Sequence, residues 1–155
     1  MIRSRILCVF LSLACVMPID CLYADNPVSL GKPVPSVSSC SLTKGEAFSF
    51  SMSGIRLNAD SGIVAYDFTM TAAALSRKDV PMMSGDMHNV TGDYADGYRL
   101  LPNGEHFAEP AVLSVSYDPL RLPAGYRPAD IYTVFYDDSV GRWVKLERLE
   151  VDTVN

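Results

Sequence analysis

One stretch decides the fold: PAGYRPADIYTVFYDDSVGRWVKLERLEVD, residues 123–152. Residues 131–136 and 142–149 are rich in β-branched and aromatic side chains, which favour strands. Between them lies Asp-Asp-Ser-Val-Gly, residues 137–141, a short loop with Gly where a hairpin needs a positive φ. The stretch therefore predicts a β-hairpin.

Further strands are predicted upstream of this hairpin. Apolar side chains alternate with small or polar ones over residues 48–53, 63–71 and 112–117, and shorter runs occupy 55–57 and 98–101. Alternation with a period of two predicts half-buried strands. We interpret 63–76 as a strand extending into a loop, and 79–97, rich in Pro, Gly, Asp and Asn, as an irregular crossing loop. Short strands without an amphipathic helix predict an all-β fold, an antiparallel immunoglobulin-like β-sandwich.

The N-terminus has the pattern of an export signal. Basic Arg3 and Arg5 precede a largely apolar run, residues 6–17. This run is too short to cross a bilayer as a helix, which takes about 20 residues. A basic segment, a short apolar run and a small residue at the cut characterise a secretory signal peptide, so we expect residues 1–24 to be removed after Ala24. The alternative is that residues 6–17 form a buried strand or helix of the fold.

A second form of processing also fits this segment. Ser12-Leu13-Ala14-Cys15 resembles a bacterial lipobox, in which the cysteine is lipidated and becomes the mature N-terminus. Lipidation at Cys15 would anchor the protein to a membrane. Either form of processing predicts an exported protein that is periplasmic, on the cell surface or secreted.

The remaining chain has the composition of one acidic domain. Removing residues 1–24 takes two basic and one acidic residue from totals of 13 and 18, so the net charge changes from −5 to −6. No basic cluster is left, and nucleic acid is therefore not an expected partner. Only Cys40 of the four cysteines follows the cut, so a packed core must replace internal disulfides. Residues 25–39, rich in Pro and Ser, predict a flexible linker before a domain at 40–155.

Three consecutive features of the domain carry a family resemblance. They are NVTGDYADGYRLLPNGEHFAEPAVLSVSYDPLRLPAGY (89–126), the hairpin strand DIYTVFYDD, and GRWVKLERLEVDTV after it. This order resembles the N-terminal β-sandwich module of large bacterial secreted proteins with RHS/YD repeats, related to virulence-plasmid and insecticidal toxins. It also resembles the ZU-type sandwich of ankyrins and netrin receptors. The resemblance covers roughly residues 50–154 and implies a structural module without catalytic residues.

The resemblance also implies partners. Modules of this kind continue into a further strand and a long repeat region, so we expect this chain to be a front piece that lacks its final strand. Its partners would be downstream domains or the repeat region of the same or a neighbouring chain. Without the next strand, residues 142–152 would form an exposed sheet edge, and unpaired backbone groups template association. Self-association through this edge is therefore expected.

Large aromatic side chains are assigned first to the core, because their burial removes much apolar area from water, at about 25 cal/mol per Å². The candidates for the core are Phe107, Tyr117, Phe135 and Trp143. Pro lacks the N–H that a central strand needs, so corners are expected at Pro110, Pro119 and Pro123. The candidates for an exposed ligand surface are Tyr94, Tyr98, Tyr126 and Tyr132. They would serve an alternative function, a self-standing surface module that binds carbohydrate or mediates adhesion.

No constellation for chemistry is evident. His88 and His106 lie on separate segments without zinc-ligand spacing. Four loop carboxylates, Asp93, Asp96, Asp137 and Asp138, have oxygen ligands for Ca²⁺ but no EF-hand spacing. A glycosylation sequon is present at Asn89-Val90-Thr91. We therefore predict no catalytic residue, metal or cofactor, and a non-catalytic structural or interaction module as the function.

Overall fold

The computed structural model describes residues 1–9, 13–18, 36–85, 87–92, 94–103 and 105–152. Its strands are β1 (Ile2–Val9), β2 (Leu13–Pro18), β3 (Val37–Leu42), β4 (Phe48–Met52), β5 (Ile55–Ala59), β6 (Phe68–Leu75), β7 (Met87–Asn89), β8 (Gly97–Leu101), β9 (Glu105–Val115), β10 (Tyr132–Asp137), β11 (Arg142–Lys145) and β12 (Glu147–Val151). Three short 3₁₀ turns accompany them: η1 (Arg77–Asp79), η2 (Pro119–Arg121) and η3 (Pro128–Asp130).

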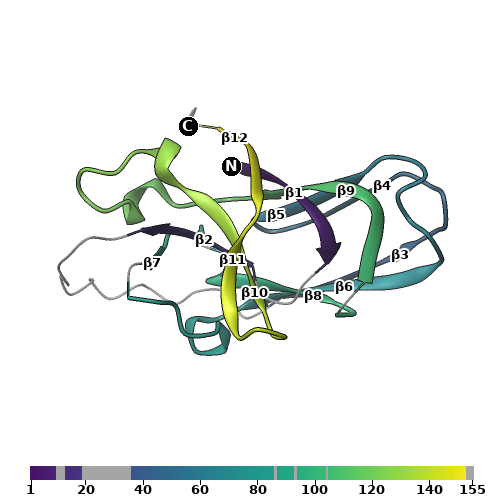
Figure 1. The fold of residues 1–155 in the computed structure, drawn as a ribbon, viewed down its shortest axis with the longest axis horizontal. Coiled ribbons are helices and arrows are strands. Elements are labelled where there is room, and N and C mark those ends of the chain that lie inside the picture. Colours follow the sequence, from purple (N-terminus) through teal and green to yellow (C-terminus); the bar gives the residue numbers. More distant parts are fainter. Residues whose placement is uncertain (10–12, 19–35, 86, 93, 104, 153–155) are drawn as a thin grey trace.

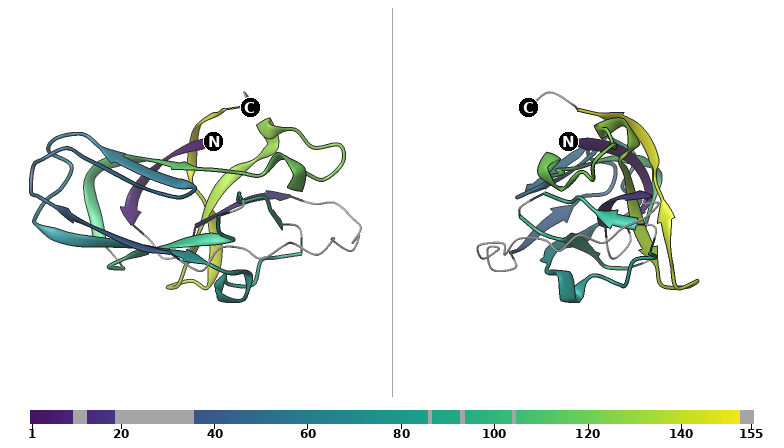
Figure 2. Two further views of the ribbon diagram at one scale, coloured as in Figure 1. Left: turned by 180° about the vertical axis from the view of Figure 1, so that it is seen from behind. Right: turned by 90° about the vertical axis from the view of Figure 1, so that its left-hand side faces the viewer.

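The strands form two antiparallel sheets that pack face to face (Figure 1). The first sheet has the order β12-β1-β9-β5-β4, and the second has the order β11-β10-β2-β8-β6-β3, with β7 also paired to β2. The two layers are seen from behind and from one end in Figure 2. The prediction of an all-β antiparallel sandwich is confirmed.

The core fills the space between the sheets, and it follows the predicted alternation. In β5, Ile55, Leu57 and Ala59 are buried while the residues between them are more exposed. From the second sheet, Met70 and Leu100 are fully buried against them in the same cluster. Each such side chain contributes about 1.5–3 kcal/mol through removal of its apolar surface from water.

The four aromatic residues assigned to the core differ in depth. Phe107 is buried, and Tyr117 and Phe135 are partly buried against the main core. Trp143 packs instead on a small second cluster around Val134, and it is only half-buried. The expectation that Trp143 is mostly buried is therefore wrong in degree, because β11 lies at the edge of its sheet.

The predicted hairpin is confirmed, but its second strand divides. β10 pairs with β11 from Val134 opposite Lys145 to Asp137 opposite Arg142, and Gly141 in the turn has a φ of 65°. At Leu146 the chain leaves the second sheet and crosses to the first, where it continues as β12 (Figure 1). The Leu146 N–H donates to the carbonyl oxygen of Thr133 at 2.9 Å and its side chain packs on the core, so the crossing is held in place.

Three local predictions need correction. β9 begins at Glu105, so Pro110 lies within a strand rather than at a corner. The register between β9 and β1 shifts in this region, and such an irregularity tolerates the absence of an N–H at Pro. β7 lies inside the predicted crossing loop, and β3 begins at Val37, so residues 37–39 belong to the sheet rather than to the linker.

The N-terminal segment contributes two strands. β1 lies between β9 and β12, and β2 lies between β10 and β8. Residues 6–9 of the apolar run thus lie in β1 and residues 13–17 in β2. Removal of residues 1–24 concerns processing and stays a prediction, with its cut outside the described residues. Cys15, the lipidation candidate, pairs through its backbone with Thr133. Among the described residues, no helix has the length and apolar character needed to cross a membrane.

Candidate functional site

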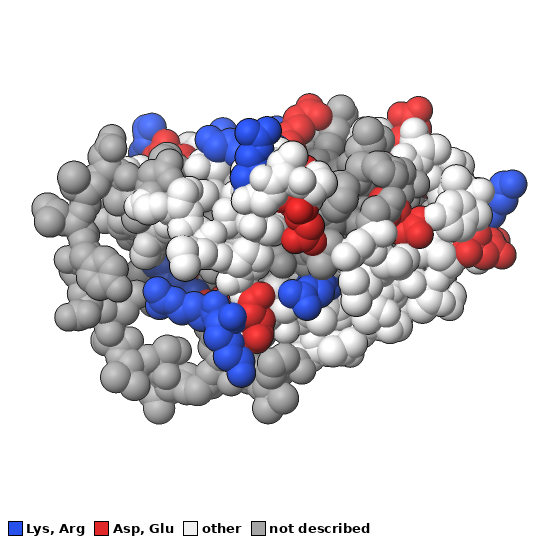
Figure 3. Space-filling view, turned by 60° about the horizontal axis from the view of Figure 1, so that its bottom comes forward, with Lys and Arg blue, Asp and Glu red and all other residues white. Residues whose placement is uncertain are grey.

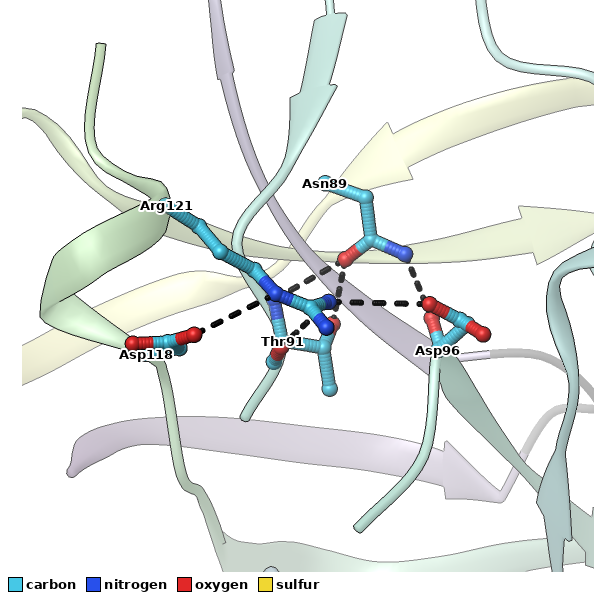
Figure 4. A network of polar contacts seen from close by, with 5 residues as sticks. All are labelled: Asn89, Thr91, Asp96, Asp118 and Arg121. Carbon is cyan, nitrogen blue, oxygen red and sulfur yellow. Dashed lines mark hydrogen bonds and ion pairs between the residues drawn. The ribbon is translucent and has the colours of Figure 1, made fainter. Parts of the chain in front are cut away.

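A polar cluster surrounds Arg121, and we call it the Arg121 cluster (Figure 4). Its guanidinium lies 3.6 Å from the Asp96 carboxylate and 3.3 Å from the Asp118 carboxylate, and it donates to the carbonyl oxygen of Thr91 at 3.1 Å. Asp118 also caps the η2 turn by accepting from the Leu120 N–H at 2.9 Å. The cluster joins the loop after β7 to η2.

Asn89 completes this cluster from the end of β7. Its amide nitrogen donates to the carbonyl oxygen of Asp96 at 2.6 Å, and its amide oxygen accepts from both the N–H and the hydroxyl of Thr91, at 2.9 and 2.6 Å. Asn89 and Thr91 belong to the predicted glycosylation sequon. The fold uses the amide group of that sequon as a structural brace for the loop.

The cluster is largely buried, and its polar groups bind one another and the backbone. Thr91 and Asp96 are buried, and the Arg121 side chain is only 25% exposed. Charges in such a place need close partners, because isolated burial is costly. Here two carboxylates and a carbonyl oxygen surround a single guanidinium.

A shallow, open hollow lies where the chain crosses from β11 to β12. It is lined by Tyr126, Ala129, Asp130, Tyr132, Lys145, Leu146 and Arg148. The Lys145 ammonium lies 3.8 Å from the centroid of the Tyr132 ring, a cation–π contact. Arg148 donates to the carbonyl oxygens of Ala129 and Ile131, at 2.6 and 2.8 Å, and so ties η3 to β12.

The four tyrosines predicted to form a ligand surface do not lie together. Tyr126 and Tyr132 line the hollow, while Tyr94 is exposed but is not part of its lining. Tyr98 is 0% exposed, so its assignment to an exposed surface is wrong. β8 is a central strand of the second sheet, and its alternation turns this ring into the core.

Two of the candidate calcium ligands, Asp96 and Asp137, have local partners. Asp96 belongs to the Arg121 cluster, and Asp137 accepts from the N–H and hydroxyl of Ser139 in the hairpin turn, which lowers the pKa of Asp137. Asp93 and the side chain of His106 lie outside what the structure describes. Within the part of the chain that it does describe, no group of three His, Cys, Asp or Glu side chains could hold a metal ion.

Among the described residues, His88 is a histidine whose pKa is shifted by its surroundings. Burial lowers its pKa below the usual value of 6.5; a hydrogen bond with the Arg121 backbone opposes this shift, and the charges of Arg121 and Arg77 add to it. A neutral imidazole on β7 is thus favoured beside the Arg121 cluster.

On the face drawn in Figure 3, Lys and Arg side chains are interspersed with Asp and Glu, and neither sign forms a continuous field over the described residues. Comparison of the chain with protein-family models, with curated proteins and with solved structures finds no match in any of the three.

Sequence reasoning missed Arg121 and Lys145. The spacing of Asp118 and Arg121, three residues apart after a proline, was a local signal for their pairing. The partners Thr91 and Asp96 come from a distant loop, and no sequence pattern links that loop to η2. Lys145 reaches Tyr132 across the hairpin, and the register of β10 and β11 had to be known to place this contact.

Proposed function

We propose that this chain is an exported, non-catalytic β-sandwich module that serves as the N-terminal structural or interaction segment of an RHS/toxin-like envelope or secreted protein. The observation that carries the proposal is that the polar side chains of the Arg121 cluster hold loops together. Asn89, Asp96, Asp118 and Arg121 bind one another and the backbone, and so brace two loops. The leader pattern of residues 1–24 and the resemblance of residues 89–152 support export and the kind of parent protein.

The module would act by display. The leader exports it, the Pro- and Ser-rich residues 25–35 space it from the envelope, and the sandwich docks onto a following domain. Docking uses sheet edges, which offer unpaired backbone groups and are used in strand-to-strand recognition. The terminal positions in the two sheets are held by β11, β12, β3 and β4.

Export is tested by expressing the full chain in a bacterium with two membranes and fractionating the cells. Mass spectrometry of the exported protein should find Asp25 as its first residue. Lipidation would instead leave a modified Cys15 as the first residue in the membrane fraction, and Cys15→Ser would abolish it. The control is the double variant Arg3→Glu, Arg5→Glu, which removes the basic segment that export needs. An intact wild-type chain that stays in the cytoplasm would contradict the proposal.

The parent protein is tested by reading the genomic frame past Asn155. Repeats of the Tyr-Asp type in frame, or just downstream, are expected. An isolated gene with its own regulation would count against an RHS/toxin-like parent.

A second candidate function, binding of carbohydrate or an adhesion ligand, is favoured by the hollow at β11 and β12. Tyr126 and Tyr132 offer aromatic faces there, and Lys145 adds a charge. Aromatic faces combined with polar tips suit ligands that are apolar on one side and polar on another. A glycan array with the full chain tests this function. Binding should be lost in Tyr126→Ala and Tyr132→Ala and kept in Tyr94→Ala, since Tyr94 does not line the hollow.

A further inference from the structure

Strand β1 fills a slot between two strands that do not pair with each other. It runs antiparallel to β9 on one side and to β12 on the other. Among the described strands, β12 pairs only with β1. The place of β12 in the first sheet therefore depends on whatever occupies this slot.

The occupant of the slot belongs to the segment predicted to be removed on export. Cleavage after Ala24 would take away β1, together with β2, and would leave the N–H and C=O groups of β9 and β12 that pair with β1 without their ladder partners. Each buried backbone group left without a partner costs about 1–3 kcal/mol. An exported sandwich would be under strong pressure to fill the slot again.

We propose that the slot between β9 and β12 is a strand-addition site, filled in the exported protein by an extended segment of a partner polypeptide. The inference rests on the proposed function, because export is what vacates the slot. In strand addition, main-chain hydrogen bonds provide affinity and alternate side chains provide specificity. β1 spans eight residues, which sets the length of the segment that the slot accepts.

The β9 side of the slot defines an apolar face. Ala111, Leu113 and Val115 are fully buried. The register places Ile6, Ser4 and Ile2 of β1 opposite them, in that order. Residues directly opposite each other in an antiparallel pair share a face of the sheet. A partner strand must therefore carry small or apolar residues at these three alternate positions.

The β12 side defines a charge preference. The register places Arg3 opposite Glu150 and Arg5 opposite Glu147. The two glutamates are three residues apart and the two arginines only two, because the register shifts by one residue between Arg3 and Ser4. Opposite charges across a strand pair are stabilising, and like charges are destabilising. The partner segment is accordingly basic at the two positions that face Glu147 and Glu150.

The test vacates the slot while β2 stays covalently attached to the second sheet. A specific protease site is inserted between β1 and β2, the folded full chain is cut there after purification, and the released N-terminal peptide is removed by gel filtration in mild urea. A fluorescent peptide with the sequence of residues 1–9, carrying Cys8→Ser to prevent oxidation, is then added, and its anisotropy reports binding. The uncut chain, whose slot is covalently occupied, is the control.

We expect saturable binding to the cut chain and none to the uncut chain. A peptide with Arg3→Glu and Arg5→Glu should bind about tenfold more weakly, since two favourable cross-strand pairs become repulsive. The double protein variant Glu147→Lys, Glu150→Lys should reverse this preference, and hydrogen exchange should show protection of β9 and β12 when peptide binds. If cutting lowers the melting temperature, the wild-type peptide should restore it.

Absence of saturable binding, or equal binding of the two peptides in both proteins, would overturn the proposal. A dimer of the cut chain in light scattering, with β9 protected, would assign the slot to a second copy instead. Protection of β12 without peptide would show that it closes directly onto β9, which also overturns the proposal. Failure of the proposed export is detected by a different experiment, the mass spectrometry of the protein from cells, which would find residues 1–24 still present.

Discussion

The hydroxyl of Tyr98 donates a hydrogen bond to the carbonyl oxygen of Ser53 at 2.8 Å. This contact joins β8, in the middle of the second sheet, to the turn between β4 and β5 in the first. It lies beside Gly54, which has a φ of 82° and whose carbonyl oxygen accepts from the Ser116 N–H at 2.8 Å. The phenol tip of Tyr98 thus fixes the distance between the two layers at this end.

Gly54→Ala should destabilise the fold more than a positive φ alone explains. A Cβ at this position would overlap the Tyr98 hydroxyl and approach the Ser116 hydroxyl to 2.8 Å. Gly62 is the matched control, because its φ is 89° and its Cβ would meet nothing within 4 Å. Urea unfolding should show a loss of about 1–2 kcal/mol for Gly62→Ala. Gly54→Ala should lose about 1–3 kcal/mol more, the cost of a disrupted hydrogen bond.

Combining Gly54→Ala with Tyr98→Phe checks the cause. Removal of the hydroxyl relieves part of the overlap, so Gly54→Ala should cost less in the Tyr98→Phe background than in the wild type. Residues in contact give such non-additive effects. Equal costs in the two backgrounds would show that the overlap with Tyr98 is not what destabilises the variant.

Arg121→Ala should lower the free energy of unfolding by about 2 kcal/mol. It removes a donor to the Thr91 carbonyl and a charge beside two carboxylates, and breaking such charged contacts costs more than breaking a neutral hydrogen bond. The neighbour Leu120 is 94% exposed, so Leu120→Ala is the control and should change stability by less than about 0.5 kcal/mol. Similar values for the two variants in urea unfolding would contradict a bracing role for the cluster.

The sequon at Asn89 should resist glycosylation in the folded chain. The nitrogen that would receive the glycan donates to the Asp96 carbonyl oxygen, and the side chain is half-buried. An oligosaccharyltransferase assay in vitro should modify a synthetic peptide of residues 86–94 and leave the folded chain unmodified, as judged by mass. Equal modification of peptide and folded chain would show that the brace opens readily.

Trp143 should contribute to the free energy of unfolding, but less than a fully buried aromatic residue. Its indole N–H donates to the Met82 carbonyl oxygen at 3.1 Å, and its ring meets Tyr136 edge-on with centroids 5.3 Å apart. Because it is half-buried, Trp143→Ala should cost about 2 kcal/mol, below the 3–5 kcal/mol or so typical of core aromatics. Fluorescence should show partial protection from acrylamide. Full quenching, with a variant that melts like wild type, would move Trp143 to the free surface.

Stability should fall as the pH decreases through the titration of His88. Burial lowers the pKa of His88 in the folded chain, so the unfolded chain binds this proton more readily. The free energy of unfolding is therefore highest above the unfolded pKa of about 6.5. It decreases as the pH falls from there through the lower pKa of His88 in the folded chain. Urea unfolding between pH 5 and 7.5 should show this slope, and His88→Gln should flatten it. An unchanged slope in the variant would remove His88 as its source.

Local patterns in the sequence were sufficient for the fold class and for the hairpin. Alternation over residues 48–53 predicted β4 correctly, because side chains of a strand turn to opposite faces whatever its neighbours are. The loop 137–141 predicted the β10–β11 turn, because Gly141 supplies a positive φ that other residues adopt only with strain. These features depend on a few neighbouring residues, which is why they could be read directly.

Tertiary structure decided how the strands are shared between the sheets and which side chains meet. Residues 142–149 read as one strand, yet packing of Leu146 on the core sends β11 and β12 to different sheets. Tyr98 alternates like any strand residue, and only the position of β8 in the centre of a sheet buries it. The physical reason is that strand register and order are set by burial and hydrogen bonding between segments far apart in the chain, and these contacts leave no local pattern.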